Sequence, residues 1–189
     1  MSIPLNKPLD LQGVNLYLIG MMGSGKTSTA KLLAQSLGYR YFDTDTLIEQ
    51  LAGCSVREIF ARWGEPQFRQ WETQVLAELS PYKNLVIATG GGIVLNPINW
   101  SYLHHGLVVW LNVPLEELSQ RLVGDRTRPL LADNPLERLQ TLLDQRRPYY
   151  AQADLQVQVR SGESAEQVAL RVLETLPTIL KSNSPPQDD

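Results

Sequence analysis

A glycine-rich segment near the amino terminus carries residues that could bind a polyphosphate. It reads Gly20-Met-Met-Gly-Ser-Gly-Lys-Thr27 and fits the pattern G-x-x-x-x-G-K-[ST] of a phosphate-binding loop. Glycines let consecutive backbone N–H groups converge on phosphate oxygens, and the start of a following helix adds partial positive charge. We expect Lys26 to reach the β- and γ-phosphates of a nucleotide and Thr27 to ligate Mg²⁺.

The segments on either side of this loop are those that its chemistry requires. A short buried strand is predicted over Asn15–Ile19, and an amphipathic helix over Lys26–Leu37. Gly38 follows where a helix ends in the left-handed conformation. A chance glycine-rich turn would lack this strand–loop–helix context, so phosphate binding is the favoured interpretation.

Two carboxylates, Asp43 and Asp45, follow a second predicted strand over residues 39–42 and precede a helical pattern. One of them could serve the hydration shell of a metal ion, and the other could bind a substrate hydroxyl. Helix capping explains them equally well, because Asp is a common residue at the start of a helix. The local sequence leaves both interpretations open.

Two further helices are predicted between that helical pattern and the third strand, although a simple crossover needs only one helix. The capping box that begins at Ser55 opens the first helix, residues 64–66 break it, and the second runs over about 67–79. Arg69 and Glu72 stand three positions apart, which predicts an ion pair on a solvated helix surface. The extra helical block also suits an acceptor-binding region beside the phosphate loop.

The third strand, Leu85–Ala88, ends in Thr89 and three glycines, Gly90, Gly91 and Gly92. Ligands of open parallel sheets bind beyond the carboxyl ends of the strands. Glycines at such a strand end let another molecule approach the backbone closely. A sharp turn is the alternative explanation, and the position favours ligand binding.

Strands alternate with helices along the chain, which predicts a parallel sheet covered by helices on both faces. Further strands are expected over 107–111 and 155–159, and further helices over 114–122, 136–150 and from 164 onwards, the last one disturbed by Pro177. Right-handed crossovers then bring the phosphate loop and the later strand ends to one edge of the sheet.

Arginines occur in two later segments. The polar, proline-bounded stretch 124–135 carries Arg126 and Arg128 and suits a lid that closes over phosphates. Arg146 and Arg147 end a predicted helix, where positive charge also suits the helix dipole. Each segment, considered alone, has an ordinary explanation as solvated charge.

The composition restricts the class of protein. The 189 residues, 43% of them hydrophobic, suit one domain, and a net charge of −3 with a pI of about 5.4 argues against nucleic-acid binding. A single cysteine, Cys54, and two histidines argue against a disulfide and a zinc site. No stretch approaches the roughly 20 apolar residues of a membrane span, and no signal-peptide run begins the chain, so we expect a cytoplasmic protein without a membrane partner.

We expect three regions along the chain. Residues 1–13 form an irregular leader, and residues 14–180 form the single domain, with its lid at about 124–134. Residues 181–189 are polar and contain two prolines, so we expect a disordered tail there.

In combination, the ordered motifs from about Val14 to about Leu176 resemble the shikimate kinase family. The resemblance implies an α/β fold, specifically a three-layer α/β/α P-loop kinase like the nucleoside monophosphate kinases. Its five parallel strands would take the order 2-3-1-4-5, with an inserted acceptor-binding helical block and a mobile lid. The residues that carry the resemblance are the phosphate loop, Asp43-Thr-Asp45, Phe68-Arg69 with Glu72, Gly90-Gly91-Gly92, Arg128-Pro-Leu-Leu131 and Arg146-x-Pro-x-Tyr150.

The resemblance also implies an activity, namely phosphorylation of the 3-hydroxyl of shikimate by ATP with Mg²⁺, by a monomeric enzyme. Lys26, Asp45 and Arg128 would be catalytic. Thr27 would ligate Mg²⁺, and Asp43 would lie near the metal beyond its direct ligands. The shikimate site would comprise Asp45, Arg69, Gly90, Gly91, Gly92 and Arg146. The ATP site would comprise Gly23, Ser24, Gly25, Lys26, Thr27, Ser28, Arg121 and Arg128, with Arg121 packed against adenine.

The stretch from Arg160 to Ser164 departs from the family, because it lacks the proline often found in the adenine-binding loop. Three other functions remain as alternatives. The first is a kinase of the same fold that acts on another hydroxy acid such as gluconate. The second is a non-catalytic ATP-binding regulatory module, and the third is an NTPase that uses water as the acceptor.

Overall fold

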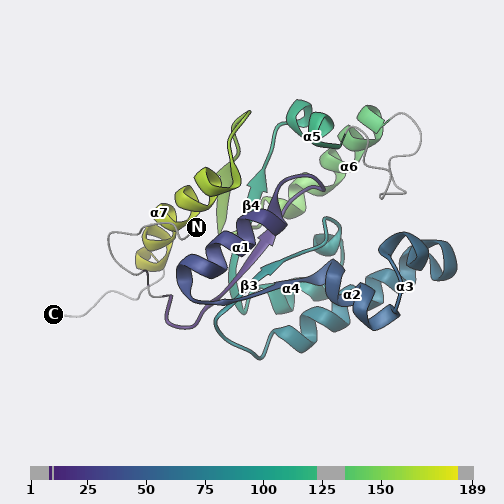
Figure 1. The fold of residues 1–189 in the computed structure, drawn as a ribbon, viewed down its shortest axis with the longest axis horizontal. Helices are drawn as coiled ribbons and strands as arrows, with labels where there is room; N and C mark the ends of the chain where they lie inside the picture. The colour runs from purple at the N-terminus through teal and green to yellow at the C-terminus, as the bar shows by residue number, and fades with distance from the viewer. Residues whose placement is uncertain (1–8, 10, 123–134, 183–189) are drawn as a thin grey trace.

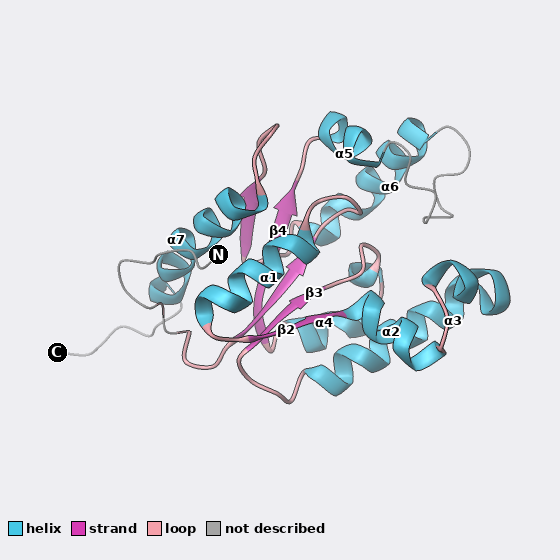
Figure 2. Ribbon diagram, viewed as in Figure 1, coloured by secondary structure: helices cyan, strands magenta, loops and turns pink. Residues whose placement is uncertain are grey.

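The computed structural model describes residues 9, 11–122 and 135–182. Within them a single parallel sheet has the strand order β2-β3-β1-β4-β5, which confirms the predicted fold (Figure 1). Helices α1 and α7 pack together on one face, and α4 and α6 lie on the other (Figure 2). The strands are β1 (Asn15–Ile19), β2 (Arg40–Asp43), β3 (Leu85–Ala88), β4 (Gly106–Asn112) and β5 (Leu155–Gln158).

Local signals in the sequence set most of the helix boundaries. Gly38 ends the first helix in the left-handed conformation, the Ser55 capping box begins the third, and the Asn96 side chain caps the fourth ahead of Pro97. The helices are α1 (Lys26–Leu37), α2 (Thr44–Ala52), α3 (Val56–Leu79), α4 (Pro97–Leu103), α5 (Leu115–Leu122), α6 (Pro135–Tyr150) and α7 (Ala165–Ser182), with a 3-10 turn, η1 (Ile93–Leu95), after β3.

The element α3 consists of two helices that meet at a kink, as the sequence predicts. The kink lies at Gly64, whose φ of 77° and ψ of 174° form a combination that is essentially restricted to glycine. Two aromatic pairs bridge the kink. The rings of Phe60 and Phe68 lie 5.0 Å apart, and those of Trp63 and Trp71 meet edge to face at 5.6 Å. These contacts hold the two helices of α3 against each other across the break.

One expectation needs correction. Helix α7 continues through Pro177, because Leu176 before the proline and Ile179 and Leu180 after it pack against the core. In the expected leader, residues 9 and 11–13 form no helix or strand, and Leu11 is almost fully buried in the core. The remaining leader residues 1–8 and 10, the lid expected at 124–134 and the tail from 183 lie outside the described residues.

The sheet topology positions the candidate site. Strand β1 lies at the centre, between β3 and β4, and β3 also pairs with β2. The carboxyl ends of β1, β2 and β3 therefore lead, at one edge of the sheet, into the phosphate loop, the pair Asp43 and Asp45, and the three-glycine segment. No helix in the described part of the chain is long and apolar enough to cross a membrane.

Candidate active site

A cleft of about 240 Å³ opens beyond the carboxyl ends of β1, β2 and β3. One wall is the phosphate loop, and the opposite wall comes from the segments that follow β2 and β3. The fold thus brings together residues that are more than sixty positions apart in sequence. The cleft is lined by Gly23, Gly25, Lys26, Thr27, Asp43, Asp45, Thr89 and Gly91.

The phosphate loop has the conformation that its glycines predict. Gly23 and Gly25 have positive φ angles of 76° and 89°, which only glycine adopts without strain. The Lys26 ammonium is buried and donates hydrogen bonds to the carbonyls of Gly20 and Met21 at 3.0 and 2.8 Å. The loop therefore holds a positive charge at its centre, as phosphate binding requires.

Asp43 caps α2 and also contacts the phosphate loop. Its Oδ1 accepts hydrogen bonds from the backbone N–H groups of Asp45 and Thr46, which caps α2. Its Oδ2 accepts a hydrogen bond of 2.9 Å from the Thr27 hydroxyl and another from Tyr41. One carboxylate thus joins the start of α2 to the start of α1 on the phosphate-loop side of the cleft.

The oxygen atoms of Thr27 and Asp43 suit a magnesium ion. No group of three or more metal-binding acids, histidines or cysteines occurs among the described residues. Magnesium in kinase sites takes few protein ligands and completes its octahedron with phosphate oxygens and water. The exposed Thr27 hydroxyl, with the Asp43 carboxylate 2.9 Å away, matches that requirement.

The three-glycine segment 90–92, here named the glycine loop, lies directly against the charged side chains of α2 and α3. A Cβ atom added at Gly90 would lie 2.5 Å from Glu72 Oε1 and 2.7 Å from Asp45 Oδ1. One added at Gly92 would lie within 2.6 Å of the Arg69 guanidinium carbon. The glycine loop has no side chains because these charged groups occupy the space, and any molecule bound at Asp45 and Arg69 meets its backbone.

Arg146 approaches the glycine loop at its middle residue. Its side chain is buried, and its Nη1 lies 3.5 Å from the position of a Cβ atom at Gly91. Its Nε is buried without a hydrogen-bond partner among the residues that the structure describes. Asp45, Arg69 and Arg146 therefore surround one short loop, and this loop faces the phosphate loop.

The Arg69–Glu72 ion pair exists, but it is not the solvated surface pair that the spacing predicts. Glu72 is fully buried, with its Oε2 2.5 Å from Arg69 Nη1, and Arg69 also pairs with the exposed Glu65. Burial raises the pKa of Glu72 to about 7, although Arg69 opposes this shift. Burial disfavours the charged form of Arg69. The carboxylates of Glu72 and Glu65 together outweigh this effect of burial and raise the pKa of the guanidinium. Arg69 thus stays positive while Glu72 can exchange a proton near neutrality.

Arg121, expected at the adenine, lies beside the phosphate loop. Its Nη1 donates to the Gly23 carbonyl at 3.4 Å, and its Nε donates to Glu117 at 3.0 Å. Glu117 also accepts a hydrogen bond from Ser161, which ties the loop after β5 to α5. Ser24 is buried inside the phosphate loop, and Ser28 is exposed on the first turn of α1, as Thr27 is. Arg126 and Arg128 lie outside the described residues.

Sequence reasoning missed the side chains that hold the glycine loop. The Thr44 hydroxyl accepts a hydrogen bond from the Gly90 N–H, and the Thr89 hydroxyl donates to the Leu18 carbonyl. The Tyr150 hydroxyl donates to the Gly91 carbonyl. The tyrosine had two available signals, since it ends the motif Arg146-x-Pro-x-Tyr150 of the family resemblance and stands one helical turn after Arg146, on the same face of the helix.

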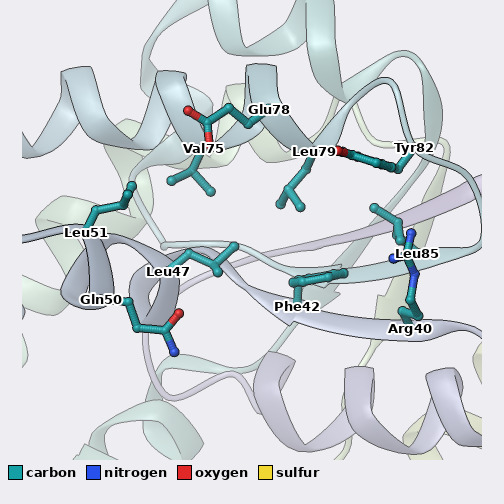
Figure 3. Close-up of a pocket in the computed structure, with 10 residues that line it drawn as sticks. All are labelled: Arg40, Phe42, Leu47, Gln50, Leu51, Val75, Glu78, Leu79, Tyr82 and Leu85. Carbon is teal, nitrogen blue, oxygen red and sulfur yellow. The ribbon is translucent and has the colours of Figure 1, made fainter.

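A larger cavity, of about 580 Å³, lies between β2, α2 and α3, and Figure 3 shows its lining. Its walls are mainly apolar, with the Arg40 guanidinium above the rings of Phe42 and Tyr82 at one end. None of the predicted site residues within the described ranges lines it. The smaller polar cleft therefore has the chemistry for phosphoryl transfer, and the larger cavity does not.

Sequence comparison identifies close relatives. The family model described as shikimate kinase matches residues 22–177. A shikimate kinase of Thermosynechococcus vestitus is 59% identical over 176 residues, which cover 93% of this chain and 96% of the relative. One of Synechococcus elongatus is 55% identical over 175 residues and 92% of each chain.

Comparison with solved structures also identifies a shikimate kinase among the similar folds. A shikimate kinase from Acinetobacter baumannii, solved in complex with shikimate, superposes with a TM-score of 0.82 at 37% identity and covers 92% of this chain and 96% of its own. A gluconokinase from Sinorhizobium meliloti superposes with a TM-score of 0.56 at 19% identity over 92% of this chain and 98% of its own. At that identity the second likeness shows a shared fold alone.

Proposed function

The chain belongs to the shikimate kinase family and transfers the γ-phosphoryl group of ATP to the 3-hydroxyl of shikimate, and we propose which of its residues carry out that reaction. The products are shikimate 3-phosphate and ADP, in a step of aromatic amino-acid biosynthesis. The observation that carries the assignment of residues is the convergence of Asp45, Arg69 and Arg146 on a glycine loop that faces the phosphate loop.

Arg69 and Arg146 bind the carboxylate of shikimate. A planar guanidinium forms two parallel hydrogen bonds to a carboxylate, which fixes orientation as well as charge. Arg69 keeps its charge because Glu65 and Glu72 stabilise it, and Arg146 presents its guanidinium to Gly91. The glycine loop, Gly90 to Gly92, lets the ring of the substrate approach the backbone.

Asp45 orients the acceptor hydroxyl and takes its proton late in the transfer. It lines the same cleft as Lys26 and Thr27, and thus lies on the side where the γ-phosphate would be. The transition state of phosphoryl transfer is loose, so positioning and charge stabilisation dominate over activation of the nucleophile. A carboxylate that holds the hydroxyl in line therefore contributes chiefly through geometry.

The phosphate loop binds ATP through Gly23, Ser24, Gly25, Lys26, Thr27 and Ser28. Lys26 stabilises the charge on the transferred group, and Arg121 packs against adenine. Thr27 would hold Mg²⁺ directly, and Asp43 would orient its water ligands. When bound, the ion neutralises the charge of the β- and γ-phosphates. We assign Arg128, outside the described residues, to the lid as an arginine that reaches the phosphates.

We also propose that residues 14–180 act as one domain, and that the protein works as a monomer in the cytoplasm, where ATP is abundant, without nucleic-acid or membrane partners. The continuous sheet supports a single domain. The acidic pI of about 5.4 supports the proposal that nucleic acid is no partner.

The test is release of ADP from MgATP with and without shikimate, for the wild type and for Asp45→Asn. We expect release to depend on shikimate, and kcat of the variant to fall by about 10²-fold or more with little change in KM for ATP. Equal release without shikimate would indicate an NTPase. A gluconate-dependent rate as high as that with shikimate would favour the hydroxy-acid alternative. A fully active Asp45→Asn enzyme would remove Asp45 from its role.

A further inference from the structure

Tyr150, the last residue of α6, joins several parts of the site through one side chain. It is fully buried, and its ring stacks on that of Trp110 in β4, with the centroids 5.7 Å apart. Its hydroxyl donates a hydrogen bond of 2.5 Å to the Gly91 carbonyl and lies 3.5 Å from the sulfur of Met21 in the phosphate loop. The residue thus contacts the sheet, the glycine loop and the phosphate loop at once.

The three carbonyls of the glycine loop are held in two different ways. Those of Gly90 and Gly92 accept hydrogen bonds from the backbone N–H groups of Ile93 and Leu95, within the turn that follows. The carbonyl of Gly91 accepts one from the Tyr150 side chain. The middle peptide of the loop is therefore oriented by a residue from a different element, almost sixty positions away.

Gly91 is also the point where the two loops of the site touch. A Cβ atom added there would lie 3.3 Å from the Met22 nitrogen, 3.4 Å from the Gly20 oxygen and 3.5 Å from Arg146 Nη1. A rotation of the Gly91 peptide would change its fit to the phosphate loop and to Arg146 together. Displacements of about 1 Å in a positioned reactant can cost about 10²-fold in rate.

The tyrosine hydroxyl has the properties of a permanent donor. Burial raises the pKa of Tyr150 to about 12, although the neighbouring Arg146 opposes the shift. The hydroxyl is therefore protonated throughout the neutral range and can always donate to the Gly91 carbonyl.

We propose that Tyr150 is a positioning residue for the acceptor site. By holding the Gly91 carbonyl, its hydroxyl sets the orientation of the glycine loop between the phosphate loop and Arg146, and thereby sets the affinity for shikimate. This inference rests on the function proposed for the glycine loop. A tyrosine that merely fills the core would contribute to stability and leave the two substrates equally bound.

The test is Tyr150→Phe, which removes one oxygen and keeps the ring that stacks on Trp110, so the fold is retained. We expect KM for shikimate to rise by about tenfold or more, because a buried carbonyl loses its donor, while KM for ATP stays within about twofold. Steady-state kinetics with each substrate varied in turn gives both values, and thermal unfolding gives the change in stability.

Two other tyrosines provide matched controls. Tyr17 is fully buried in β1, so Tyr17→Phe reports the effect of removing a core hydroxyl. Tyr149 precedes Tyr150 and is exposed, so Tyr149→Phe reports a change at the same helix end. Each of these two variants should leave KM for shikimate and KM for ATP unchanged.

A Tyr150→Phe enzyme with a lower melting temperature but an unchanged KM for shikimate would overturn the proposal. Parallel rises in KM for shikimate and ATP would do the same, since they would show a general loosening of the site. Failure of the proposed function is distinguishable, because the wild type would then release ADP without any dependence on shikimate.

Discussion

At the scale of single residues, the environment of a carboxylate decides its chemistry more than its spacing does. Glu72 stands three positions after Arg69, a spacing typical of solvated surface pairs. In the fold it is fully buried beside Asp45 and the glycine loop, and its pKa rises to about 7. A sequence pattern gives the distance between two side chains along a helix, but not the dielectric around them.

The raised pKa of Glu72 predicts a dependence of stability on pH. The folded protein holds this proton up to about pH 7, whereas the unfolded chain releases it near the usual 4.5. The contribution is therefore fully favourable below about pH 4.5 and is lost as the pH rises through about 7, and it is on the order of 3 kcal/mol in the free energy of unfolding. Chemical denaturation of wild type and Glu72→Gln between pH 5 and 8 measures it, and the variant should lack this slope.

Glu65 provides the control for that experiment, because it is a half-exposed partner of the same arginine. Glu65→Gln should keep the pH slope of the wild type. A slope that persists in Glu72→Gln would show that another group titrates, and the assignment to Glu72 would be wrong.

Asp43 illustrates what the sequence could settle at this scale. Its position before a helical pattern predicted a cap, and its position opposite a phosphate loop predicted a role near the metal. In the structure, one oxygen of Asp43 caps α2 and the other accepts a hydrogen bond from the Thr27 hydroxyl. Sequence alone could identify Asp43 as a candidate, but it could not show which neighbour each of its two carboxylate oxygens contacts.

At the scale of elements, the glycine loop has no side chains for steric reasons that can be tested. Gly92 has a negative φ of −102°, outside the left-handed region that favours glycine, so the main effect of Gly92→Ala comes from the added methyl group. That group would lie within 2.6 Å of the Arg69 guanidinium. We expect Arg69 to be displaced and KM for shikimate to rise by about tenfold or more, with KM for ATP little changed.

Gly38→Ala is the complementary control. A Cβ atom added at Gly38 would meet no atom within 4 Å, but the φ of this residue is 68°. The alanine therefore strains the backbone without contacting the site. It should lower the free energy of unfolding by about 1 kcal/mol and leave both KM values unchanged. An unchanged KM for shikimate in Gly92→Ala would mean that Arg69 adapts, and that its observed position is not needed.

Elements with local signals were predicted well, and those decided by packing were not. The cap at Ser55 and the left-handed glycine after α1 carry their information within a few residues. The continuation of α7 past Pro177 depends on contacts with the core. Proline ends a helix only when no tertiary contact compensates for it.

At the scale of the whole molecule, alternation of strands and helices predicts a parallel sheet, but not its order. The order 2-3-1-4-5 came from the family resemblance, because strand neighbours are chosen by contacts between distant segments. The same holds for the site. Lys26 could be identified from its motif, whereas Arg69 and Arg146 had equally good explanations as surface charge until the fold brought them together at the glycine loop.

The cleft lies at one end of the sheet, so a substitution at the opposite end should lower stability and leave catalysis unchanged. At the end of β1 away from the cleft, the buried Asn15 side chain donates to the Tyr82 carbonyl and accepts from the Leu85 N–H. Asn15→Ala leaves both backbone groups unpaired and should cost about 1–3 kcal/mol in the free energy of unfolding. Denaturation and steady-state kinetics together check this, and a KM that changed along with stability would contradict the separation.

The kink in α3 has a spectroscopic consequence. Trp63 and Trp71 belong to opposite halves of the helix, and their rings meet at 5.6 Å with 71° between their planes. Indoles this close couple their electronic transitions, and the sign and size of the coupling follow the angle between them. The ultraviolet circular dichroism of this pair is thus an internal gauge of the bend in α3, and it reports without any added label on the helix half that carries Arg69.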